Sequence, residues 1–167
     1  MKPQRDDEIG SAARSLSNQA LTDILSAVTK KGASVRFQAK GFSMSPFIRD
    51  GDVLTLSPLR NHLPQIGDTV AFISPATESL LIHRVIGKRG GPRFLLKGDN
   101  LPEDDGLVPL MNIVAHVLRV ERKGKETSFG LGPEKVLIAL LNRARLLTPL
   151  LLLLRKASAC AKKRVVR

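Results

Sequence analysis

The chain has 167 residues, enough for one domain with a hydrophobic core and too few for two ordinary domains. Six Phe with no Trp or Tyr argue against binding single-stranded nucleic acid by base stacking. The formal net charge is +12, and residues 134–167 alone contribute +8, from nine Lys/Arg and one acid. Such a basic segment suits an anionic partner, which is either a lipid surface or nucleic acid.

The N-terminal residues 1–33 predict a tail followed by one amphipathic helix. Residues 1–14 are charged and lack the apolar stretch of a secretory signal, so we expect a frayed start and no signal peptide. Over residues 15–31 apolar side chains recur at helical spacing, namely at Leu21, Ile24, Leu25 and Val28. This stripe can pack against the domain or lie on a membrane surface, and the pattern does not decide between them.

Residues 34–124 predict a β domain. Val35, Phe37 and Ala39 alternate with polar residues, as in a half-buried strand. Further strands are predicted over residues 53–56, 68–73, 80–87, 93–97 and 113–121, with an acidic loop over residues 98–109. A Gly-Gly-Pro turn makes a hairpin of residues 80–87 and 93–97. Because these strands follow one another without intervening helices, we predict a mainly β fold.

Residues 125–167 predict an apolar and basic helical segment. Residues 136–141 and 146–154 are apolar, with Arg143 and Arg145 between them. A spanning helix needs about 20 mostly apolar residues, and each arginine costs about 2.5–3.5 kcal/mol at a bilayer centre, so we expect no simple span. We favour a kinked helix through which residues 134–167 bind an anionic membrane surface; the alternative is a helix packed on the β core.

The one cysteine, Cys160, lies in this segment. It cannot form a disulfide within the chain or build a cysteine zinc site, and we expect no metal or cofactor. Cys160 is either a spectator thiol or, beside basic residues, a palmitoylation site.

Candidate catalytic groups lie in the β domain. Ser43 stands in Gly41-Phe42-Ser43-Met44-Ser45-Pro46, where glycine and proline favour a bend, although an ordinary loop entering a strand has the same residues. A serine nucleophile needs a base, and the chain offers His62, His83 and His116. A third group must orient the imidazole, and the acidic loop supplies Asp99, Glu103, Asp104 and Asp105. The loop is otherwise a solvated turn, and its spacing does not match the calcium-binding motif.

Five sequence blocks occur in order over roughly residues 34–120. They are Gly-Phe-Ser-Met-Ser-Pro, Asp-Gly-Asp-Val, Ile-Gly-Asp-Thr-Val-Ala-Phe, Ile-His-Arg-Val-Ile and Phe-Leu-Leu-Lys-Gly-Asp-Asn. Together they resemble the type I signal peptidase family and its relatives, the LexA-like self-cleaving repressors. Where the common bacterial enzymes have lysine before Arg-Val, this chain has His83, which is similar to the endoplasmic-reticulum, archaeal and sporulation-type branch.

The resemblance implies a signal-peptidase-like β core and a serine endopeptidase. Ser43 would be the nucleophile and its backbone N–H an oxyanion donor, while His83 would be the general base. Asp105 would orient the histidine. Asp99 would support the same site, with Asp104 the nearest alternative.

The resemblance also places Gly41, Met44 and Pro46 beside the substrate. Some relatives have a second oxyanion donor, a serine, where this chain has Gly41. Signal peptidases usually begin with a transmembrane helix, but residues 15–31 are polar and amphipathic. We therefore expect membrane association that is peripheral or C-terminally anchored, with a cytoplasmic location as the alternative.

The expected substrate is an extended signal- or leader-like peptide, cut near small residues and paired with the strand before Ser43. One alternative is a catalytically silent relative that only holds peptides. Another is a DNA-binding repressor with a self-cleavage domain. Residues 15–31 provide too little helix for a helix-turn-helix, so we expect no nucleic-acid binding.

Overall fold

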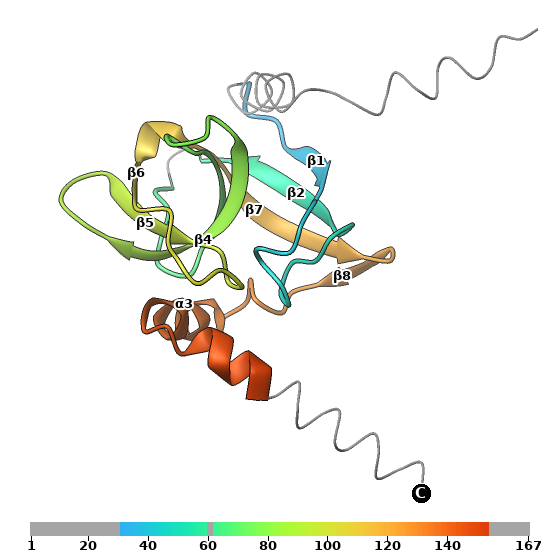
Figure 1. The fold of residues 1–167 in the computed structure, drawn as a ribbon. Helices are drawn as coiled ribbons and strands as arrows, with labels where there is room; N and C mark the ends of the chain where they lie inside the picture. The colour runs from blue at the N-terminus through green and yellow to red at the C-terminus, as the bar shows by residue number, and fades with distance from the viewer. Residues whose placement is uncertain (1–30, 60–61, 154–167) are drawn as a thin grey trace, which may run out of the picture.

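The computed structural model describes residues 31–59 and 62–153, and these fold around one antiparallel sheet of eight strands (Figure 1). The strands are β1 (Val35–Gln38), β2 (Val53–Pro58), β3 (Thr69–Ile73), β4 (Leu80–Lys88), β5 (Arg93–Lys97), β6 (Leu107–Pro109), β7 (Ile113–Arg122) and β8 (Lys125–Thr127). Their order is β1-β2-β7-β3-β4-β5-β6, with β8 paired to β7. The prediction of a mainly β protein is confirmed.

The six predicted strands are all present, and β4 and β5 form the predicted hairpin. Two short strands were not predicted. Residues of β6 pair with β5, which shortens the acidic loop to residues 98–106, and β8 pairs with the end of β7. The predicted helix over residues 15–31 lies outside the described residues, as do Cys160 and the basic end of the chain.

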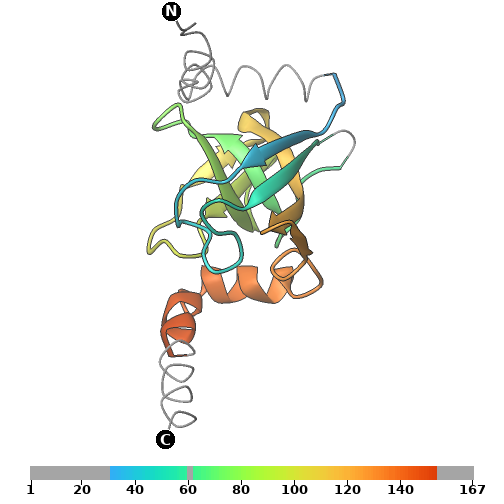
Figure 2. The same ribbon diagram turned by 90° about the vertical axis from the view of Figure 1, so that its right-hand side faces the viewer.

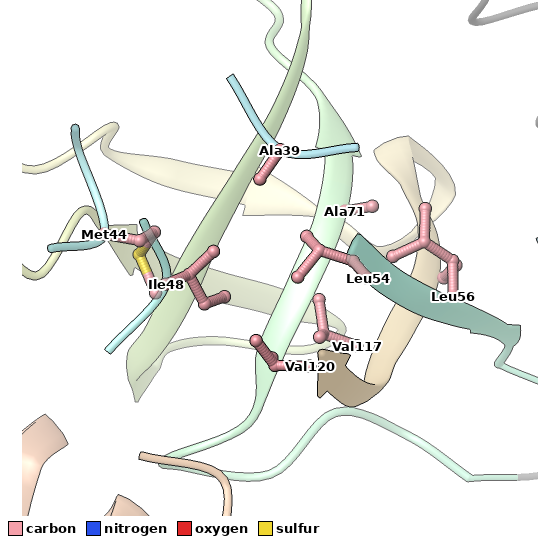
Figure 3. Packing of buried hydrophobic residues seen from close by; sticks show 9 residues of the cluster. Ala39, Met44, Ile48, Leu54, Leu56, Ala71, Val117 and Val120 are labelled. Atoms are coloured by element: carbon pink, nitrogen blue, oxygen red, sulfur yellow. The ribbon is translucent and has the colours of Figure 1, made fainter. Parts of the chain in front are cut away.

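The residues around Ser43 are tied into the core by apolar side chains. A loop of residues 39–52, here called the serine loop, joins β1 to β2. Its Met44 and Ile48 are buried in one core cluster with Leu54 of β2 and Val120 of β7 (Figure 3). The loop is therefore anchored from within, because withdrawing either side chain would expose apolar surface.

A second core cluster lies under the β3–β4–β5 part of the sheet. It contains the buried residues Val70, Phe72, Val85, Phe94, Leu96, Val108 and Ile113. Leu81 of β4 packs against this cluster, whereas its neighbour Ile82 packs against the first cluster. The two faces of β4 thus serve different parts of the core, as strand alternation requires.

The C-terminal residues form two short helices at one end of the sheet (Figures 1 and 2). The first is α3 (Lys135–Arg143), and the second, Leu147–Leu153, is bent away from it by 107°. Ile138 of α3 and Leu147 pack with Phe47 of the serine loop.

One face of α3 therefore packs on the β core, which is the alternative to membrane binding given in the sequence analysis. The outward faces of both helices and the turn between them carry exposed apolar residues, namely Val136, Leu137, Leu140, Leu146, Leu150, Leu152 and Leu153. Among the described residues no single helix is long and apolar enough to cross a membrane, and only the bent pair together reaches that length and composition.

Candidate active site

The serine loop is closed by its own backbone. Ala39 N–H donates to Asp52 O at 2.8 Å, and Gly51 N–H donates back to Ala39 O at 2.9 Å. Gly41 N–H donates to the Asp50 carboxylate at 2.8 Å. Ser43 is half-buried, and it lies between the hydrogen-bonded base of the loop and the buried Met44. The sequence therefore presents Ser43 on a braced loop rather than in a strand.

His83 and Asp105 are in direct contact. His83 pairs with Val70 across β3 and β4, and its side chain is only 3% exposed. Its Nδ1 lies 2.6 Å from Asp105 Oδ2, and the ring of Phe72 covers it at 5.8 Å between centroids. An ionised carboxylate has no hydrogen to donate, so the neutral ring carries its hydrogen on Nδ1. Nε2 is then left to accept a proton, as a general base requires.

The acidic loop is also what brings Ser43 toward His83. In the β4–β5 ladder the last pair is Arg84 with Lys97, so His83 and Gly98 are the next residues along the two chains. A Cβ on Gly98 would meet Ser43 O at 2.8 Å, and Asn100 N–H donates to Ser43 O at 2.7 Å. The Ser43 backbone therefore lies against the start of the acidic loop, one position beyond the pair of Arg84 and Lys97.

The Ser43 hydroxyl and the His83 ring, both in the described part of the chain, are not hydrogen-bonded to each other. Such bonds are often long in a free enzyme and shorten when substrate binds. The structure thus connects both groups to the acidic loop, Ser43 through Asn100 and His83 through Asp105, without a hydrogen bond between them.

Asp99 does not face His83, although we expected it to support that residue. Its carboxylate accepts from Arg84 Nε at 2.9 Å and Nη2 at 2.7 Å, and both side chains are fully buried. Arg84 follows His83 on β4 and therefore points to the opposite face. Its Nη1 donates to the carbonyls of Gly67 and Gly130, both at 2.8 Å. Asp99 is thus half of a buried ion pair beneath the site.

Asp104 has a local role in the acidic loop. Its Oδ1 accepts from Gly106 N–H at 3.0 Å, as in an Asx turn. Asp105 is held by its own backbone, since its N–H donates to Leu96 O at 2.9 Å. Of the three candidate carboxylates, Asp105 is the one that contacts the histidine.

The residues expected beside the substrate differ in exposure. Gly41 is exposed, with a φ of +90° and open space where a Cβ would lie. Pro46 is half-buried, whereas Met44 is 4% exposed and packs in the core. The side chain of Met44 is therefore an anchor for the serine loop and does not line a substrate site.

Lys97 is a buried amine close to the site. Burial lowers the pKa of Lys97, and the nearby charge of Arg145 lowers it further, while Asp104 and Asp99 act in the opposite direction. Its Nζ donates to Asn142 O of α3 at 3.2 Å. Because Lys97 pairs with Arg84, it shares the Arg84 face and points away from His83.

Three residues of this corner were not predicted, namely Arg84, Gly98 and Asn142. Asn142 Nδ2 donates to Asp99 Oδ1 at 3.0 Å. Its signal in the sequence is a lone amide within an apolar helical stretch. Within residues 31–59 and 62–153 no cluster of His, Cys, Asp and Glu could hold a metal ion.

Comparison with known protein families found no family model that matches the chain, and no curated protein matches it.

Proposed function

We propose that this chain is a serine endopeptidase that resembles type I signal peptidases of the histidine branch. The observation that carries the proposal is the 2.6 Å contact between His83 Nδ1 and Asp105. The 2.7 Å bond from Asn100 N–H to Ser43 O holds the serine backbone at the same corner. The signal-peptidase-like fold is part of the proposal and rests on the five sequence blocks.

The proposed reaction is acyl transfer through Ser43. His83 Nε2 takes the hydroxyl proton while Oγ attacks the peptide carbonyl, and the imidazolium then gives that proton to the leaving amine. Asp105 stabilises the imidazolium and keeps the ring oriented. The Ser43 N–H is an oxyanion donor. Water then attacks the acyl-enzyme with His83 again as base, which frees the new carboxyl end and restores Ser43.

The substrate is proposed to bind as an extended peptide beside β1. This strand is at one end of the sheet order, and within the described residues only β2 pairs with it. The edge of β1 that has no partner strand among the described residues leads directly into the serine loop. A peptide added there would pair through its backbone and bring its scissile bond to Ser43.

The test is mass spectrometry of the protein incubated with a signal-peptide-bearing substrate. We expect Ser43→Ala and His83→Ala each to abolish cleavage, and the double variant to be no worse, because groups that act as one unit are non-additive. Asp105→Asn should lower kcat by up to about 10⁴-fold. The matched control is Asp104→Asn, which removes a charge but keeps a side-chain oxygen that can accept from Gly106 N–H, and it should change the rate by less than about threefold.

Cleavage that survives in His83→Ala would remove His83 from the mechanism. If the wild-type protein binds the peptide without cutting it, the silent peptide-binding relative is the better reading. Gly41, where some relatives have a serine donor, favours that second candidate.

We also propose that the C-terminal helices bind an anionic membrane surface. The supporting observation is that Leu137 and Leu140 are 59% and 52% exposed on the outward face of α3. Exposed apolar residues beside Arg143 and Arg145 have the amphipathic character of an interfacial helix. The cytoplasmic alternative predicts no lipid binding by this face.

A further inference from the structure

Asn142 is a buried polar residue whose bonds join α3 to the acidic loop. It is 1% exposed. Its Nδ2 donates to Asp99 Oδ1 at 3.0 Å and, more weakly, to Gly98 O at 3.4 Å. Its Oδ1 is buried without a hydrogen-bond partner in the described part of the structure.

Residues 98–100, which include both hydrogen-bond partners of Asn142, also contact the serine loop. Asn100 N–H donates to Ser43 O at 2.7 Å, and Asn100 Nδ2 donates to Phe42 O at 3.2 Å. Residues 98–100 are therefore held between the amide of Asn142 and the backbone that carries Ser43. The far end of the acidic loop has a separate attachment, because Asp105 N–H donates to Leu96 O of β5.

We propose that Asn142 is a positioning residue, which holds residues 98–100 against the serine loop and so places Ser43 relative to His83. Its effect on catalysis rests on the proposed peptidase function, but its effect on the loop does not. The His83–Asp105 contact should not depend on Asn142, since that end of the loop is anchored to β5.

Helix docking alone does not account for an amide at this position. Ile138 and Ala139 already bury the inner face of α3 with apolar side chains. Burying an amide is unfavourable unless both of its polar atoms are bonded, and Asn142 Oδ1 is not. A leucine of similar size would avoid that cost. The hydrogen bonds to Asp99 and Gly98 therefore explain why an amide occupies this position.

The test compares Asn142→Leu with Ile138→Ala. Both variants change the inner face of α3, but only Asn142→Leu removes the polar contact to the acidic loop. The first readout is hydrogen exchange of the Asn100 amide, measured by NMR on the full chain without substrate. In Asn142→Leu we expect the Asn100 amide to exchange roughly five- to tenfold faster than in wild type. In Ile138→Ala we expect its exchange rate to change only as much as the free energy of unfolding of the whole protein requires.

The second readout is cleavage of the signal-peptide-bearing substrate. We expect Asn142→Leu to lower kcat with little change in KM, because the edge of β1, beside which the peptide is proposed to bind, is unaltered while Ser43 is displaced. The hydrogen-bonded Nδ1 proton of His83 should keep its wild-type NMR resonance, since Asp105 is held independently. If Asn142→Leu does not fold, Asn142→Ser, which shortens the side chain, is measured in the same way.

The proposal is overturned if the exchange rate of the Asn100 amide is unchanged in Asn142→Leu. It is also overturned if Ile138→Ala speeds this exchange as much as Asn142→Leu does, after the change in overall stability is taken into account. Faster exchange confined to the Asn142 variant supports it. If that result is accompanied by a wild-type protein that cleaves no peptide, the positioning role stands while the proposed peptidase function fails.

Discussion

Gly98, the residue after β5, limits how closely the serine loop approaches the acidic loop. A Cβ built on it would lie 2.8 Å from Ser43 O and 2.9 Å from Leu101 Cδ1. A backbone oxygen cannot move aside as a flexible side chain can. Any side chain at position 98 would therefore displace the loop that carries Ser43, or the turn that carries Asn100.

We predict that Gly98→Ala lowers kcat/KM by about 100-fold, since a misplacement of about 1 Å in a reacting group has an effect of that size. The matched control is Gly87→Ala. A Cβ there would meet Arg143 Nη1 at 2.9 Å, which is the mobile end of a long side chain. Steady-state cleavage assays on both variants check this, and equal activities would show that Gly98 does not set the position of Ser43.

At the scale of elements, one ion pair braces the serine loop where β2 begins and β7 ends. Arg122 donates to both carboxylate oxygens of Asp52, at 2.9 Å and 2.8 Å, and to Phe47 O at 3.0 Å. Arg49 N–H donates to Asp52 Oδ2 at 2.8 Å. Burial by itself would raise the pKa of Asp52, but the bonds from Arg122 and Arg49 outweigh it and hold this pKa below its ordinary value.

This lowered pKa makes stability depend on pH in one direction. Around the ordinary aspartate pKa of 3.8 the unfolded chain takes up the proton before the folded chain does. The contribution of Asp52 is therefore complete above that pH and is lost as the pH falls through the lower folded-state pKa. We predict that Asp52→Asn reduces the free energy of unfolding by about 1–3 kcal/mol at pH 7, and by progressively less below about pH 4.

Urea unfolding of wild type and Asp52→Asn at pH 7 and pH 3 measures this difference. Glu126→Gln is the control, because Glu126 meets Arg119 at 3.3 Å in an ion pair whose side chains are 57% and 53% exposed. Exposed pairs contribute about 0–1 kcal/mol. A loss in Asp52→Asn that is as large at pH 3 as at pH 7 would mean that the charge of Asp52 does not stabilise the fold.

The longer strands could be predicted from the sequence, but the shortest could not. Alternation is visible at Val35 and Phe37, whereas β4 and β7 are recognisable as long, mostly apolar runs between turn residues. In β6 and β8 only three residues pair, which is too few to show a period. Each exists because a neighbouring strand offers it a partner edge, and that depends on the tertiary fold.

The candidate site was predictable in part, for a similar reason. Ser43 and His83 lie in the sequence blocks, the resemblance to the family adds Asp105, and the β4–β5 hairpin brings His83 and Asp105 together across 22 positions. Asp99 and Asn142 are 43 positions apart, and no local pattern says where α3 docks. Asp99 pairs with the buried Arg84, which follows His83 on β4 and points to the opposite face, and the sequence alone does not reveal this.

At the scale of the whole molecule, the candidate site and the C-terminal helices lie at the same end (Figures 1 and 2). Asn142 connects them directly through its bond to Asp99. If the outward faces of the helices bind lipid, as proposed, the serine loop and the acidic loop lie close to the membrane surface. Removal of everything after Gly132 would not test this cleanly, because it also removes Asn142 from beneath the site.

We therefore predict that Leu137→Ser and Leu140→Ser, which leave the packed face of α3 intact, each weaken binding to anionic vesicles by about tenfold. Leu118→Ser on β7 is the control, since Leu118 is also exposed, at 65%, but belongs to the sheet. Binding is measured by co-sedimentation with phosphatidylglycerol vesicles, and it should fall as salt screens the basic residues. Equal binding by the α3 variants and the Leu118 variant would exclude this face as the lipid contact, and binding that does not respond to salt would exclude the basic residues from it.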